Sequence, residues 1–250
     1  MEKSSTTRLG YSLCALLTVV FLLSGCAFLG GRSEHAEQAR ELFSDALANI
    51  EAGELDQALG NLSRLRREFA DTPQGRQAVL EKAYVSYRLG RFAEAIELLE
   101  KYAEGRPDAA SEDIAYAMFL RASAAYSRWQ EQTAPLDTSV ARQAFTFYRQ
   151  FVQRFPESER VEEALRQMSR IRSDLAAEEL RRARASMAEG ELVEAAERAA
   201  WVAEQYPGQQ EAGDALALQA DALERLGRPR QAKATRRMLE IKHPQHPAVE

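Results

Sequence analysis

A glycine followed five residues later by an alanine recurs at four places that share further marks, and this spacing limits the possible fold more than any other sequence feature. A second alanine stands seven residues before each of these glycines. The four sets are Ala46, Gly53 and Ala58; Ala83, Gly90 and Ala95; Ala183, Gly190 and Ala195; and Ala220, Gly227 and Ala232. A fixed spacing of this kind is typical of repeat architectures, in which one unit cannot bury its apolar face alone.

Each set predicts a hairpin of two helices. A small residue where two helices cross lets their backbones approach, and glycine accepts the positive φ of the turn between them. Proline cannot continue a helix, and it follows the second alanine by twelve residues in three sets, as Pro107, Pro207 and Pro244. The first set has Ala70 at that place, with Pro73 three residues later.

A fifth hairpin fits between the two pairs, with Ala122, Ala144 and Pro156 at the matching places and an insertion near 130–139. The units then fall at 39–72, 76–109, 115–158, 176–209 and 213–246. No glycine or proline lies between Pro156 and Gly190, so we predict one long helix from Ser158 to Ala188 that joins units 1–3 to units 4–5.

The marks resemble those of the tetratricopeptide repeat, which is 34 residues long. Apolar residues within 91–103 and 192–206 recur at helical steps, and we find no convincing alternating strand pattern. The predicted fold is therefore all-α, a tetratricopeptide-repeat α-solenoid of about five helix hairpins. A generic helical bundle with accidental glycines is the alternative.

The first residues read as a targeting segment. Lys3 and Arg8 precede a mostly apolar run from Leu9 to Leu23, which is too short to span a bilayer core of ~30 Å but suits a secretory signal. The run ends in Leu23-Ser24-Gly25-Cys26, which resembles the lipobox of bacterial lipoproteins. That resemblance implies removal of 1–25, lipid on Cys26 and anchoring in the outer membrane facing the periplasm; an ordinary signal peptide is the alternative.

These marks divide the chain into a signal peptide at 1–25, a lipidated cysteine and tether at 26–35, repeats 1–3 at 36–158, and the long helix with repeats 4–5 at 159–250. Cys14 would leave with the signal and Cys26 would carry lipid, so the mature chain would hold no disulfide. Its stability would then come from packing.

Composition and motifs disfavour catalysis, cofactors and nucleic acid. The net charge is −5, with 33 basic and 38 acidic residues and no basic domain. Three histidines and two cysteines leave little for a metal site, and we interpret His243 and His246 as part of a surface loop. Phosphate-binding glycine loops and nucleophile elbows are absent from the sequence. We interpret Glu178 and Glu179, which precede Arg181 and Arg182, as a solvated helix face.

A binding function has more support, because stacked hairpins form a concave surface lined mainly by the first helix of each unit. Aromatic residues and arginines are the usual anchors for extended peptides. Half of the aromatics there should be core, and Arg88 and Arg121 are expected to be exposed. The candidate groove residues are Tyr84, Tyr87, Arg88, Tyr116, Phe119 and Arg121.

Lipobox, five repeats and a joining helix together resemble the BamD (ComL) family of outer-membrane β-barrel assembly lipoproteins over roughly 35–245. The likeness is clearest from Phe145 to Phe151 and from Arg154 to Ser158. It implies a non-enzymatic scaffold that docks on the periplasmic POTRA domains of BamA, joins accessory Bam lipoproteins and receives unfolded barrel precursors. Arg198, in Glu197-Arg198-Ala199-Ala200-Trp201, matches the family arginine that pairs with an acidic residue of BamA.

Two segments depart from the family pattern. Residues 69–75 replace a tyrosine-proline-x-serine run, and Glu189 stands where members often carry a basic residue. A pilotin-type lipoprotein that assembles a secretin or pilus would share the lipobox and the repeats, but would need neither the long helix nor Arg198. An enzyme is the third hypothesis, and it would require a catalytic domain of roughly 100 residues for which the repeats leave no room.

Overall fold

The structure is a computed structural model that describes residues 33–104, 112–133 and 136–249. Within those ranges the regular structure is helical throughout, as predicted. The contacts between residues divide the chain into two compact units, Met1–Gly105 and Arg106–Glu250.

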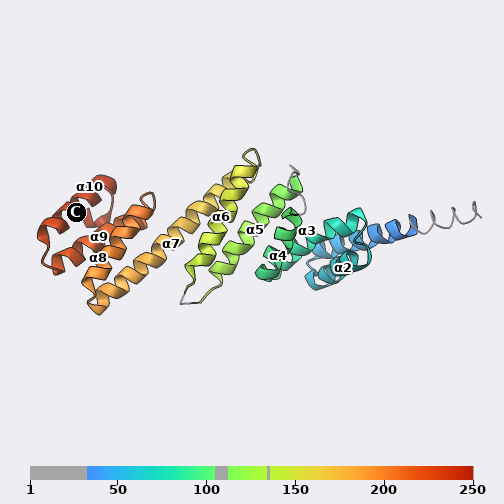
Figure 1. Cartoon of the computed structure of the whole chain (residues 1–250), viewed down its shortest axis with the longest axis horizontal. Helices are drawn as coiled ribbons and strands as arrows, with labels where there is room; N and C mark the ends of the chain where they lie inside the picture. The colour runs from blue at the N-terminus through green and yellow to red at the C-terminus, as the bar shows by residue number, and fades with distance from the viewer. Residues whose placement is uncertain (1–32, 105–111, 134–135, 250) are drawn as a thin grey trace, which may run out of the picture. The chain divides into compact units, whose positions relative to one another are not determined.

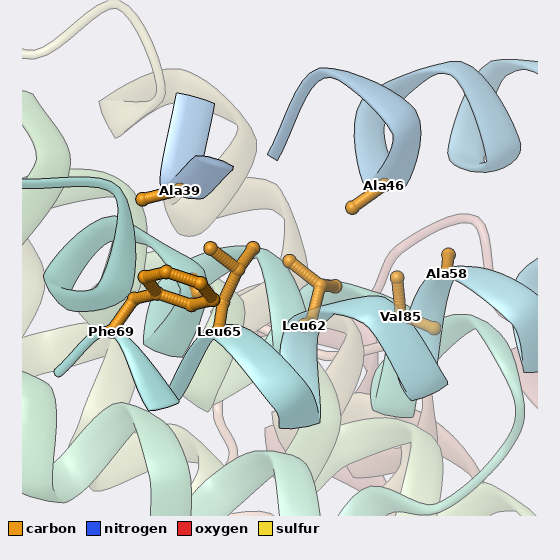
Figure 2. Close-up of a cluster of buried hydrophobic side chains, with 8 residues drawn as sticks. Ala39, Ala46, Ala58, Leu62, Leu65, Phe69 and Val85 are labelled. Carbon is orange, nitrogen blue, oxygen red and sulfur yellow. The ribbon is translucent and has the colours of Figure 1, made fainter. Parts of the chain in front are cut away.

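The first unit contains a helical stretch at 33–52, then α2 (Leu55–Glu68), α3 (Pro73–Arg88) and α4 (Phe92–Glu104). Consecutive helices pack on one another, α2 on α3 and α3 on α4. Figure 2 shows Leu62, Leu65 and Phe69 of α2 and its end projecting toward Ala39 and Ala46 of the first helix. Residues 33–35, which the sequence placed in the tether, are already helical.

The second unit contains α5 (Glu112–Gln130), α6 (Thr138–Arg154), α7 (Val161–Glu189), α8 (Leu192–Gln205), α9 (Glu211–Arg225), α10 (Pro229–Lys242) and a short 3₁₀ turn, η1 (Pro247–Val249). Each helix packs on the next, as Figure 1 shows, and α7 also contacts α9. The third hairpin, α5–α6, thus packs with the long helix. The division of the repeats between residues 158 and 159, with units 1–3 before it and the long helix and units 4–5 after it, stays a prediction.

The long helix α7 has 29 residues, or about 44 Å at 1.5 Å per residue. It begins three residues later and ends one residue later than the predicted 158–188 span. The late start follows from the turn at 155–158, where the Ser158 N–H donates to the Phe155 carbonyl.

The repeat alanines lie where the hairpin helices pack together. All those named from the sequence, including Ala122 and Ala144 of the fifth unit, are at most 1% exposed. Because a methyl group occupies so little space, neighbouring helices can pack closely at these points. The sequence-based interpretation of the alanines is confirmed.

The four repeat glycines end the first helix of their hairpins. Their φ values are positive: 77° at Gly53, 72° at Gly90, 85° at Gly190 and 70° at Gly227. At Gly190 the N–H of Glu191 donates to the Ser186 carbonyl at 2.8 Å, and the glycine N–H donates to the Met187 carbonyl at 3.3 Å. This is the Schellman pattern, and the same pair of bonds recurs at the other three glycines.

The prolines also lie where the repeat predicts. Pro156, Pro207 and Pro244 each follow the last residue of their helix by two positions. Pro107 lies outside the described residues. In the first unit Pro73 opens α3 instead, and the Thr72 hydroxyl caps that helix by accepting from the Gly75 N–H at 3.0 Å.

Candidate docking surfaces

Arg198 lies near the middle of α8, and two carboxylates hold its guanidinium. Its Nε and Nη2 donate to Glu194 Oε1 at 2.8 and 2.6 Å, and its Nη1 lies 3.6 Å from Glu179 Oε2 on α7. The side chain is 38% exposed. Arg198 therefore joins two helices and also exposes part of its guanidinium to solvent. Another carboxylate could bind the guanidinium from the solvent side.

A surface depression surrounds Arg198 and extends along α8. Its lining residues are Gly190, Glu191, Leu192, Val193, Glu194, Glu197, Arg198 and Leu226. A second depression between α8, α9 and α10 shares Val193, Glu197 and Leu226 with the first. Val193 is 47% exposed, so apolar surface lies beside the charged groups, as in the anchor region of many interfaces.

The carboxylates near Arg198 influence one another. Hydrogen bonds from Arg198 lower the pKa of Glu194, which stays ionised at neutral pH. A hydrogen bond with Glu194 in turn raises the pKa of Glu191. Glu189 and Glu197 are also exposed nearby, so this end of the surface is acidic. A partner carboxylate can bind Arg198 only where its approach avoids these like charges.

Trp201 adds an aromatic anchor that the sequence-based site omitted. It lies three residues after Arg198 on α8, is 39% exposed and packs edge-on against Tyr206 at 5.6 Å between ring centroids. Large exposed aromatics beside an arginine are frequent hot spots of protein interfaces. The helical spacing of Arg198 and Trp201 is the signal that could have identified it.

The predicted solvated face at Glu178 is wrong. Glu178 is 4% exposed, and its carboxylate accepts hydrogen bonds from Arg181 at 2.8 Å and from Arg182 at 3.0 Å. Those bonds, Arg181 first, lower its pKa despite burial. Arg182 also donates to Glu179 and to the Leu136 carbonyl in the loop before α6. The network therefore fixes the Glu179 carboxylate that contacts Arg198.

The groove candidates of the first unit form one small aromatic and cationic group on α3. Arg88 is exposed, as expected, and its Nη1 donates to the Tyr84 hydroxyl at 2.8 Å. Tyr84 packs at the edge of the core cluster, and the Tyr87 ring lies 5.7 Å from that of Phe92 on α4. Tyr84 and Tyr87 are both half-buried, so each serves packing and surface together.

The groove candidates of the second unit are more firmly packed. Phe119 lies edge-on to Tyr148 and Phe151 of α6 at 5.7 and 5.6 Å. Arg121 differs from the expectation of exposure: it is half-buried, with its guanidinium 4.0 Å from the centre of the Phe147 ring and Nη2 3.1 Å from Gln150 Oε1. The Tyr116 ring lies 5.1 Å from the Arg160 guanidinium. These contacts secure α5 on its neighbours.

The two candidate groups belong to different compact units, so a shared groove stays a prediction. Of the other aromatics on those helices, Tyr126 and Trp129 are buried in α5, and the Tyr126 hydroxyl donates to Asp174 of α7 at 2.5 Å.

Cys26 lies outside the described residues. The predicted surface loop at 243–247 is half-buried at its histidines, and His246 Nε2 lies 2.9 Å from Asp214 Oδ1.

Metal sites and membrane spans have no support in the described part of the chain. No group of three or more histidine, cysteine or acidic side chains in those ranges could hold a metal ion. The described helices also include none that is long and apolar enough to cross a membrane.

Comparison with known proteins gives consistent matches. A family model described as "YfiO: Outer membrane lipoprotein" matches residues 35–239. "Outer membrane protein assembly factor BamD" of Neisseria meningitidis serogroup A is 27% identical, covering 93% of this chain and 92% of that protein. The protein of the same name from Xylella fastidiosa strain 9a5c is 25% identical over 94% and 83% of the two chains.

Among solved structures, the TPR2AB domain of yeast Sti1 in a complex with pHSP90 overlaps with a TM-score of 0.45 at 14% identity, covering 84% of this chain and 79% of that chain. YrrB, a TPR protein with an unusual peptide-binding site, overlaps with a TM-score of 0.38 at 18% identity, covering 82% and 86%. The family model spans most of the sequence, and therefore this chain belongs to the BamD/YfiO family of outer membrane lipoproteins, the assembly factors of outer membrane proteins.

Proposed function

We propose that the chain is a non-enzymatic scaffold that docks on the POTRA domains of BamA through the surface around Arg198. The observation that carries the proposal is the half-exposed Arg198 fork, held by Glu194 and Glu179 beside the exposed Val193 and Trp201. An arginine fork held in place by its own chain loses little side-chain entropy when it binds a second carboxylate. Charged and apolar anchors then act together.

The lipid on Cys26 would hold this scaffold at the outer membrane, facing the periplasm. Accessory Bam lipoproteins would join it there, and unfolded barrel precursors would contact the aromatic and arginine groups of α3 and α5. Tyr84, Tyr87 and Arg88 support this role best, because part of each side chain reaches the surface. Phe119 and Arg121 support it less, since both side chains contact neighbouring helices of their own unit.

Charge reversal at Arg198 tests the docking proposal. We expect Arg198→Glu to weaken binding to purified BamA by about 10–100-fold, because loss of an arginine that an interface buries costs about 2 kcal/mol or more of binding free energy. Arg198→Gln, which adds no negative charge beside Glu194, should show a smaller loss. Arg166→Glu on α7 is the matched control, since Arg166 likewise pairs with two glutamates, Glu162 and Glu163 of its own helix. Titration calorimetry measures binding, and circular dichroism checks helix content.

Two results would contradict the proposal. Normal BamA affinity of folded Arg198→Glu would remove Arg198 from the docking surface. Capture of a secretin without BamA by the lipid-anchored chain would instead favour a pilotin-type function. Either result leaves the family assignment standing, since that rests on the match over residues 35–239.

A further inference from the structure

The last long helix, α10, is richer in basic residues than the chain as a whole, with five among its 14 residues. Its basic residues are Arg230, Lys233, Arg236, Arg237 and Lys242, and its one acidic residue is Glu240. The whole chain has a net charge of −5. This local excess of cations is not explained by the docking surface on α8.

The charges fall on a definable face of α10. Ala232, Thr235 and Leu239 are its buried residues and mark the inner side. At 3.6 residues per turn, Arg230, Lys233, Arg237 and Ile241 fall on the opposite side, and all four are exposed. Met238, which is 41% exposed, lies at one margin of that side, and the exposed Glu240 lies at the other. We call Arg230, Lys233, Arg237, Met238 and Ile241 the basic face.

Within the chain the cations of the basic face are available for binding. Arg236, which lies outside the face, pairs with Asp221 and Glu224 of α9. Across residues 33–104, 112–133 and 136–249, by contrast, Arg230, Lys233 and Arg237 form no ion pair. Ile241 is 72% exposed, the highest value among the exposed large apolar side chains in the part of the chain that the structure describes. Three cations without an ion pair therefore share one side of α10 with an apolar residue whose side chain lies mostly in water.

We propose that the basic face of α10 docks on an anionic phospholipid surface. Long lysine and arginine side chains can reach lipid phosphates while Ile241 and Met238 enter the boundary between headgroups and acyl chains. A protein partner usually meets aromatic anchors, and α10 has none. The chain belongs to a family of outer membrane lipoproteins, so its lipid anchor would hold it near a bilayer. Even a weak contact between α10 and that bilayer would then form often.

A fluorescent label on the mature lipid-anchored chain tests the contact. Ala234, exposed between the cations, is replaced by cysteine and labelled with a polarity-sensitive dye. With Cys26 acylated and Cys14 removed with the signal, this is the one free thiol expected. The chain is inserted into phosphatidylcholine vesicles with or without phosphatidylglycerol. We expect a blue shift, with quenching by brominated lipid, in the anionic vesicles only, and reversal by high salt.

Removal of the charges gives the quantitative test. Each cation near an anionic surface is worth about 1 kcal/mol, or about fivefold, so Arg230→Gln with Lys233→Gln and Arg237→Gln should lower the docking constant about 100-fold. The matched control replaces Arg64, Arg66 and Arg67 of α2 by glutamine, which removes the same charge from another exposed cluster. That control should keep the blue shift.

Three outcomes would overturn the proposal. They are an equal dye response in neutral and anionic vesicles, an equal loss in the α2 control, and binding of poly-glutamate to the face without any response to anionic vesicles. The last result would identify an acidic polypeptide as the partner. None of them depends on whether Arg198 binds BamA.

Discussion

Gly75 is the position where a single methyl group should most disturb the first unit. It lies in the first turn of α3, directly against the segment that closes α2. A Cβ on Gly75 would lie 1.9 Å from the Phe69 carbonyl oxygen, 2.6 Å from its carbon and 3.0 Å from the Ala70 Cα. All three atoms belong to the backbone, so a rotamer change cannot relieve the clash. Gly75→Ala must therefore open the turn at 69–75.

The cost follows from what that turn holds. The Thr72 hydroxyl accepts from the Gly75 N–H and donates to the Phe69 carbonyl at 2.7 Å, and loss of such a helix cap costs about 1 kcal/mol. Phe69 is 4% exposed and packs 4.6 Å from the His35 ring, so shifting it costs about 1–3 kcal/mol. The better helix propensity of alanine returns up to about 1 kcal/mol. We expect a net loss of about 1–3 kcal/mol in free energy of unfolding.

Urea unfolding followed by circular dichroism measures the loss, and hydrogen exchange locates it in α2 and α3. Gly60→Ala is the matched control, because Gly60 lies inside α2 and no contacting atom lies within 4 Å of the place that a methyl group would take there. That control should gain about 0.5–1 kcal/mol. If Gly75→Ala is as stable as Gly60→Ala, or if faster exchange appears outside the first unit, the reasoning from the clash is wrong.

Two further changes test the ion network and the anchor. Glu178→Gln should cost about 1–2 kcal/mol at neutral pH, the low end for a buried pair because Arg181 remains largely solvated. Because folding lowers the pKa of Glu178, its contribution to stability is present above the unfolded pKa and disappears as pH falls through the folded pKa. The free energies of unfolding of the two proteins, measured with urea, should therefore converge in acid. A difference that stays constant with pH would contradict this account. Cys26→Ser should release the protein from isolated outer membranes, and retention in the membrane fraction would refute the lipobox.

The repeat was predictable because its signals are local. A positive φ at the end of a helix strongly favours glycine, and a close helix crossing favours alanine, so the backbone requirement appears directly in the residue type. Gly190 and Ala195 illustrate this, the first at φ 85° and the second fully buried. The helices and their order could therefore be derived from spacing alone.

Side-chain environments were harder to predict because they depend on neighbours distant in sequence. Glu178 has the helical spacing of a surface ion pair, yet it is buried where α7 meets its neighbours. Arg121 was expected to be exposed, because a charge is rarely buried without a partner, but the Phe147 ring from the next helix covers it. For Glu178 the spacing reveals its arginine partners on the same helix but not its burial, and for Arg121 it reveals neither the burial nor the partners on the next helix.

The net charge of the whole chain gives no sign of the basic face of α10, because the C-terminal hairpins contain charges of both signs. A net charge of −5 averages the glutamates near α8 with the cations of α10, so no basic region appears in the total. In the folded chain the two helices expose opposite charges, with Arg198 among carboxylates on α8 and Arg230, Lys233 and Arg237 on one side of α10. An acidic surface repels an anionic bilayer and a basic one attracts it, so the same pair of hairpins can bind a protein through α8 while α10 contacts lipid.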